Sequence, residues 1–101
     1  MNFLTNLSMK TEYSIFFSTS FKKDLKKQIS NEIFVKDTIK ILAEKGVKGI
    51  PENRLPHLLK GKYKNYWECH IKPDLLLIWK QNDEEKSIIL ARVGSHSNLF
   101  E

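Results

Sequence analysis

The sequence predicts an α+β fold with the element order βααβββ, in which a two-helix hairpin packs on one face of a mainly antiparallel sheet. One short segment rich in aromatic and β-branched residues precedes two segments with helical periodicity, and three strand-like segments joined by short turns follow them. A chain of 101 residues is too short to build two independent hydrophobic cores. We therefore expect a single domain over residues 1–101.

The first strand is expected from Glu12 to Phe17. Residues 1–10 show no apolar period, so we interpret them as an N-terminal extension, and Met9 would serve as an alternative start. This segment lacks the apolar run and cleavage site of a signal peptide, and no segment approaches the roughly 20 apolar residues of a membrane span. We expect a cytoplasmic protein with no membrane partner.

Two helices are expected next. The first follows the hydroxyl-bearing residues 18–20, which offer N-cap oxygens, and its apolar face is formed by residues spaced four apart: Phe21, Leu25 and Ile29. The second begins after Asn31 and ends near Gly46, where glycine accepts a left-handed conformation. Its apolar stripe consists of Val35, Ile39 and Leu42.

The stretch from Val47 to Gly61 contains glycine and proline and is expected to be an ordered loop that carries His57. Three strands should follow, at Tyr66–Ile71, Leu75–Lys80 and Ser87–Val93. Their links are turn-forming, so consecutive antiparallel hairpins are expected. Because Leu75 to Trp79 is apolar on both faces, it should be the central strand.

The net charge of +5 and the pI near 9.4 favour a polyanionic partner, nucleic acid above all, although a merely solvated basic surface is the alternative. The lone Cys69 excludes an intramolecular disulfide framework. Cys69 alternates with His70 along a strand and should point to the opposite face, so we interpret it as a core residue rather than half of a Cys–His nucleophilic pair.

All three histidines lie in the C-terminal half, next to turns or loops: His57, His70 and His96. Imidazoles exchange protons near neutral pH, and a sheet presents groups to a ligand at its strand ends. Three unrelated surface histidines remain the alternative. Their wide separation matches no local metal-ligand spacing, so we expect no metal and no cofactor.

Two further residues have both a chemical and an ordinary interpretation. Asp74 can orient an imidazole or accept a proton, but a proline–aspartate pair also forms turns. Arg92 is the one basic residue in an apolar strand, where a guanidinium can bind a phosphate or pair with a carboxylate. Position alone does not decide between these roles.

Three segments carry a resemblance to a known family: HLLKG, YWECHIKPDLLLIW and LARVGSHSNLF. They resemble the YafQ-like toxins of the RelE/ParE superfamily, whose pattern has a histidine-leucine-glycine loop, a CHxxPDxLLxY hairpin and an RxGSHxxLF tail. The segment YSIFFSTSFKKDLKK looks like the family's opening strand and helix, so the resemblance extends from about Tyr13 onward. Trp67 stands where the family usually has arginine, and Trp79 where it commonly has tyrosine.

The resemblance implies a RelE-like fold and a type II toxin that cuts mRNA in the ribosomal A site. It also implies a cognate antitoxin, expected to be acidic, and an association with operator DNA through the toxin–antitoxin complex. The catalytic set implied is His57, His70, Asp74, Arg92 and His96. Substrate contacts are assigned to Phe100, Trp67, Lys60 and Lys62.

RNA supplies its own nucleophile, the 2′-hydroxyl, once a base accepts its proton, so this set would not require a metal. We assign His70, supported by Asp74, as base or base orienter, His96 as acid, and Arg92 as the stabiliser of phosphate charge. His57 would hold the phosphate. Phe100 would stack on a base, unless the Leu99–Phe100 pair merely docks on the core. The alternatives to a nuclease are a non-catalytic nucleic-acid-binding module and a degenerate toxin that only binds its antitoxin.

Overall fold

The computed structural model describes residues 11–100, and the expected extension at residues 1–10 lies outside this range. Its elements are β1 (Ser14–Phe17), α1 (Thr19–Lys26), α2 (Glu32–Lys45), β2 (His57–Leu58), β3 (Trp67–Lys72), β4 (Leu75–Asn82), β5 (Ser87–Gly94) and α3 (His96–Phe100). No helix in the described range is long and apolar enough to cross a membrane.

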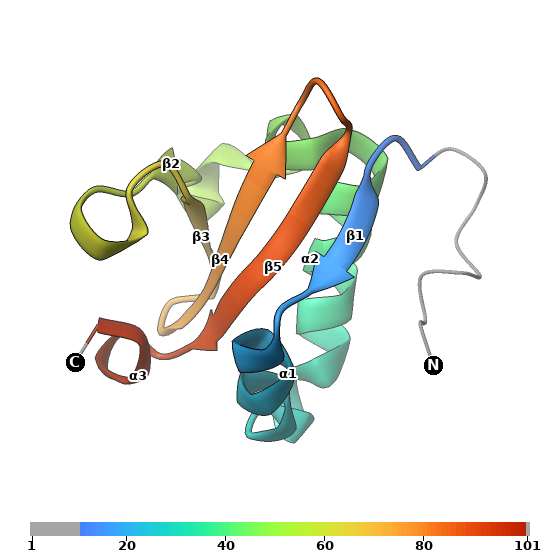
Figure 1. The fold of residues 1–101 in the computed structure, drawn as a ribbon. Coiled ribbons are helices and arrows are strands. Elements are labelled where there is room, and N and C mark those ends of the chain that lie inside the picture. Colours follow the sequence, from blue (N-terminus) through green and yellow to red (C-terminus); the bar gives the residue numbers. More distant parts are fainter. Residues whose placement is uncertain (1–10, 101) are drawn as a thin grey trace.

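The strands form one sheet in the order β1-β5-β4-β3-β2 (Figure 1). β1 runs parallel to β5, and the other neighbours are antiparallel. β4 therefore lies in the middle of the sheet, and its residues Leu75 to Trp79 are all buried. The predicted α+β class, the mainly antiparallel sheet and the central strand are confirmed.

Helix α2 covers one face of the sheet, which we call the inner face (Figure 1). The predicted stripe of Val35, Ile39 and Leu42 has no exposed area and packs with Leu77 and Trp79 of β4. Burying one such side chain contributes about 1.5–3 kcal/mol. The inner face therefore holds the larger part of the core.

The first helix is shorter than predicted. Ser18 caps it as expected, since its Oγ accepts a hydrogen bond from the Phe21 amide at 3.0 Å and also donates to the Ala91 carbonyl of β5 at 2.9 Å. Phe21 is buried, but α1 ends at Lys26, and Ile29 lies in a following 3₁₀ turn with 72% of its area exposed. The placement of Ile29 on the apolar face was wrong, because the chain leaves the helix before reaching it.

The opposite face, here called the outer face, has its own small core. Leu76, Ile78 and Leu99 are buried there beneath the loop that carries Tyr63 and Tyr66. Two predictions are corrected by this arrangement: α3 gives the outer face a helix as well, and the expected loop over 47–61 contains 3₁₀ turns and strand β2. Because β2 pairs with β3, His57 is held by a strand rather than by a free loop.

Candidate active site

Three polar residues lie together on the outer face because of strand register. His57 of β2 is directly opposite Glu68 of β3, which is opposite Ile78 of the outer core. His70 lies two residues further along β3, and side chains two apart on a strand share a face. The register thus brings the predicted residues His57 and His70 to one surface, with Glu68 between them.

The two ring nitrogens of His57 each face an oxygen atom. The ring nitrogen Nδ1 of His57 lies 2.7 Å from the carbonyl oxygen of Leu55, so Nδ1 must carry the hydrogen. The other nitrogen, Nε2, lies 3.3 Å from Oε1 of Glu68. An imidazole and a carboxylate, two group types that general acid–base catalysis uses, therefore lie within reach of each other.

Glu68 is the residue that the sequence analysis missed. It is only 6% exposed, and its second oxygen, Oε2, has no hydrogen-bond partner among the described residues. A buried carboxylate oxygen without a partner costs free energy, so such groups in native structures call for an explanation. The signal was available: the same alternation that sends Cys69 to the inner face puts Glu68 on the face of His70.

His70 and Asp74 do not contact each other in the way the sequence suggested. Nδ1 of His70 lies 3.2 Å from the carbonyl oxygen of Pro73, which fixes the proton on Nδ1 and leaves Nε2 free to accept one. Asp74 Oδ1 instead accepts a hydrogen bond from the backbone amide of His96 at 3.3 Å. Asp74 therefore ties the β3–β4 turn to α3, and the polypeptide backbone orients His70.

His96 and Phe100 lie one turn apart on α3, with ring centroids 5.0 Å apart. The Phe100 ring meets Tyr63 edge-on at 6.0 Å and is 40% exposed, whereas Leu99 is 2% exposed. Each of the two alternatives for the Leu99–Phe100 pair therefore holds for one of its residues. Leu99 docks on the outer core, and Phe100 presents a ring to solvent beside His96.

Arg92 pairs with a carboxylate, which is one of the two roles that the sequence left open for it. Its Nε and Nη2 donate to the two oxygens of Asp24 in α1 at 2.7 and 3.1 Å, and Nη1 donates to the Tyr63 hydroxyl at 3.3 Å. The hydrogen bonds to Asp24 raise the pKa of the guanidinium above its ordinary value. Arg92 thus joins α1 to the loop that supports Phe100, and it is cationic at any physiological pH.

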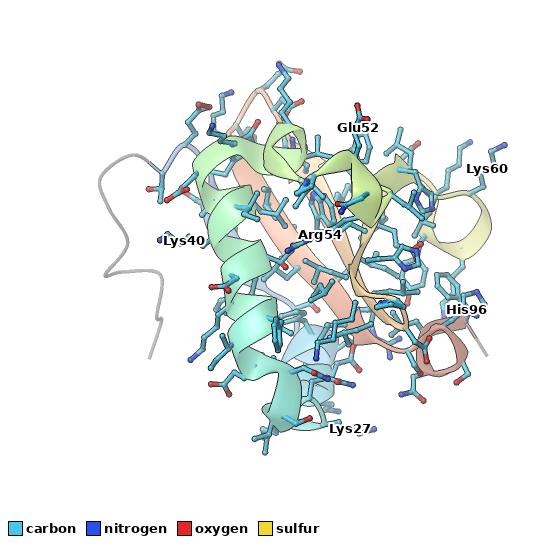
Figure 2. The ribbon with its side chains drawn as sticks, turned by 180° about the vertical axis from the view of Figure 1, so that it is seen from behind. Lys27, Lys40, Glu52, Arg54, Lys60 and His96 are labelled. Atoms are coloured by element: carbon cyan, nitrogen blue, oxygen red, sulfur yellow. The ribbon has the colours of Figure 1, made fainter. Side chains whose placement is uncertain are left out.

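The other predicted substrate residues lie further out. The Trp67 ring stacks on Trp79 at 6.5 Å and packs against the inner core, so it faces away from His57 and Glu68. Lys60 and Lys62 are exposed on the loop around Tyr63, and Figure 2 shows Lys60 at the outer end of that loop. Cys69 is fully buried, and burial raises the pKa of its thiol to about 12, as expected for a core residue.

The His57–Glu68 pair and His70 share the outer face, and the turn that follows His70 contacts α3 through Asp74 and the His96 amide. His96 and Phe100 lie together on α3. These residues form the candidate site. In the described range, no three histidine, cysteine, aspartate or glutamate side chains converge on a point that a metal ion could occupy.

The comparison with known families decides the assignment. Residues 13–101 match the model of the bacterial YafQ toxin of type II toxin–antitoxin systems. The chain belongs to the YafQ toxin family. The match begins at the residue before β1, so it includes every element described above.

Individual YafQ relatives agree with this assignment. The mRNA interferase toxin YafQ of Escherichia coli K12 is 41% identical over 44 residues, which span 44% of this chain and 46% of that relative, so the match covers about half of the curated protein. The solved E. coli DinJ–YafQ toxin–antitoxin complex contains a chain with 28% identity and a TM-score of 0.77, with 89% of this chain and 99% of that chain covered. The RelE-like fold that the YafQ resemblance predicted is confirmed.

A metal-bound toxin from Helicobacter pylori is also similar, with 36% identity, a TM-score of 0.74, and coverage of 87% of this chain and 99% of that one. In the present chain, the nearest arrangement to a metal site is the His57–Glu68 pair. It supplies two donors, and no third donor side chain converges with it in the described range.

Proposed function

We propose that this chain is the toxin of a type II toxin–antitoxin system and a ribosome-dependent endoribonuclease that cuts mRNA and so inhibits translation. The family match over residues 13–101 carries this proposal. The gathering of His57, His70 and His96 on one face supports it further. Binding alone does not need three imidazoles, which argues against a module that only binds nucleic acid.

The reaction proposed is transfer of the phosphodiester to the 2′-oxygen. A base removes the proton of the 2′-hydroxyl, the O2′–P bond forms, the P–O5′ bond breaks, and an acid protonates the leaving 5′-oxygen. His70 is assigned as the base, because its Nε2 is free to accept a proton. His96 is assigned as the acid, beside the exposed Phe100 ring on which a nucleotide base would stack.

Two further groups support this chemistry. The His57–Glu68 pair would take from His70 the proton that this base has removed from the 2′-hydroxyl, and so restore the base for the next turnover. Arg92 would stabilise negative charge on the phosphate through the two N–H groups that Asp24 and Tyr63 leave free. Lys60, Lys62 and Trp67 stay assigned to contacts with substrate or ribosomal RNA at the rim of the site.

The partners proposed are mRNA, the ribosomal A site and an acidic antitoxin, with operator DNA reached through the toxin–antitoxin complex. The net charge of +5 supports polyanionic and acidic partners. A ribosomal target implies the cytoplasm. The pairing of β1 with β5 joins the two ends of the described range in one sheet, which supports a single domain.

Primer extension on a translated message tests the proposal. Cleavage should leave a 2′,3′-cyclic or 3′-phosphate upstream and a 5′-hydroxyl downstream, because attack by the 2′-hydroxyl dictates those ends. His96→Ala should lower the cleavage rate by about 10²–10⁴-fold without changing the melting temperature. A 5′-phosphate product or a fully active His96→Ala variant would contradict the mechanism. No growth arrest on induction of the wild-type chain would contradict the activity itself.

A further inference from the structure

A hollow of about 480 Å³ lies beside His70, at the end of β3 that β2 does not cover. Its walls come from residues 53–55, from the last residues of β3 and from the β3–β4 turn. Asn53, Arg54, His70 and Lys72 contribute its polar groups, and none of the residues that line it is acidic. The hollow thus adjoins the proposed base and carries only positive formal charge.

Both cations of the hollow are held in place by neutral partners. Arg54 is half-buried and points toward α2 (Figure 2), where its Nη1 donates to Oγ1 of Thr38 at 3.1 Å. Lys72 Nζ donates to Oδ1 of Asn31 at 2.9 Å and lies 4.1 Å from the centre of the Phe34 ring. Within residues 11–100, neither cation forms an ion pair with a carboxylate.

This differs from the other positioned cation near the site. Arg92 is neutralised by Asp24, whereas Arg54 and Lys72 keep their charge uncompensated while their side chains are oriented. Orienting a long cationic side chain costs conformational entropy, and two uncompensated cations beside one hollow repel each other. An anion bound between them would relieve that repulsion with charge-assisted hydrogen bonds.

We propose that the Arg54–Lys72 hollow binds a phosphodiester of RNA adjacent to the one cut at His70, and that it sets the register of the strand in the site. The inference rests on the proposed function, which places RNA at His70. A neighbouring phosphate fits better than a single small anion, because the hollow is open and continuous with the wall formed by His70. The phosphodiester can belong to the message or to ribosomal RNA, and both have the same chemistry.

The test measures binding of a single-stranded RNA whose nucleotide at the cleavage site is 2′-deoxy, so that it cannot be cut. Fluorescence anisotropy over a salt series gives the slope of log affinity against log salt, which changes by about 0.7 for each phosphate contact on a single strand. Lys72→Gln and Arg54→Gln should each reduce the slope by about that amount. Lys40→Gln is the matched control, because Lys40 is an exposed lysine on the side of α2 away from the hollow (Figure 2).

A second measurement assigns the source of the phosphate. If the variants lose affinity for the isolated RNA, the hollow binds the message. If they keep that affinity but show a raised KM for ribosome-dependent cleavage, the hollow binds ribosomal RNA. Either result supports the proposal. Unchanged slopes and unchanged KM in folded variants of an active wild-type chain would overturn it. So would a loss of affinity confined to an acidic antitoxin, since the hollow would then serve a protein. A wild-type chain that cuts no RNA would instead defeat the proposed function.

Melting temperatures separate this effect from misfolding. Arg54 contacts the buried Thr38, so Arg54→Gln can weaken the fold, whereas Lys72 bonds to Asn31 near the surface. Lys72→Gln is therefore the decisive variant. A folded Lys72→Gln protein with the wild-type salt slope and the wild-type KM would be sufficient to reject the hollow as a phosphate site.

Discussion

Glu68 shows how one buried side chain can be poor for stability and useful for chemistry. Its carboxylate has one polar partner, His57, and an oxygen with none among the described residues. Removing an unpaired oxygen from water costs about 1–3 kcal/mol. The cost is understandable if the carboxylate holds a proton for the His57 ring, whose orientation is already fixed by the Leu55 carbonyl.

Glu68→Gln should therefore lower cleavage by about 10²-fold, because the amide keeps the shape of the side chain but cannot take the proton. The melting temperature should stay the same or rise, since a neutral amide is less costly to bury. The pH–rate profile should also change shape, which a merely structural role would not produce. Glu52→Gln, at an exposed position outside the His57–Glu68 pair, is the control and should behave as wild type (Figure 2). Equal rates and equal pH profiles for both variants would exclude a role for Glu68 in proton transfer.

The element scale shows where reading the sequence succeeded and where it failed. Local periodicity was enough to predict α2, β3, β4 and β5, because each has a regular apolar pattern of its own. The Asp24–Arg92 pair joins residues 68 apart, and the parallel β1–β5 contact joins Ser14 to Ser87. No local pattern encodes such partners, so Arg92 was left with two alternative roles. β2 has only two residues and carries too little pattern to be recognised.

The same limit explains the mixed outcome for the site. The motif residues His57 and His70 lie on the outer face, and Phe100 is exposed beside His96. Asp74 and Trp67 have other contacts, with the His96 amide and with Trp79. Sequence proximity suggested the His70–Asp74 contact, but the backbone of the turn directs the carboxylate toward α3 instead.

Asp24→Asn should destabilise the fold by about 2–4 kcal/mol, because it leaves a mostly buried guanidinium without its counter-charge. Side-chain exposures of 13% for Asp24 and 24% for Arg92 support an effect of that size. Asp24 Oδ2 also accepts the Val93 amide at 3.1 Å, so the end of β5 loses a second contact. Urea denaturation measures the change. Asp37→Asn, at an exposed position on α2, is the control, and its free energy of unfolding should stay within about 0.5 kcal/mol of wild type. An equally small effect of Asp24→Asn would show that the Asp24–Arg92 pair contributes little to stability.

At the scale of the whole molecule, the two faces of the sheet have different tasks. The inner face, under α2, holds most of the buried apolar side chains, while the outer face holds a small core and the candidate site. Substitutions in the candidate site therefore need not disturb the main core. The positive net charge adds a long-range attraction for polyanions that no single residue supplies.

An acidic antitoxin should bind this chain in a complex whose association slows as salt rises, because long-range attraction between opposite charges is screened. Co-expression with the product of the adjacent gene, followed by size-exclusion chromatography, should give one peak that contains both chains. Association rates should fall as the salt concentration rises from about 0.05 to 0.5 M, because the Debye length shortens over this range. Separate elution of the two chains would remove the antitoxin from the proposed partners.

The parallel pairing of β1 with β5 also determines when, during synthesis of the chain, the sheet can be completed. β1 is made early by the ribosome, but the strand it pairs with begins at Ser87, so the edge of the sheet stays open until most of the chain has been synthesised. Arg92, His96 and Phe100 are made later still, and they complete the site on a framework that only then closes. The candidate site therefore cannot form before His96 and Phe100 have been synthesised and have left the ribosome.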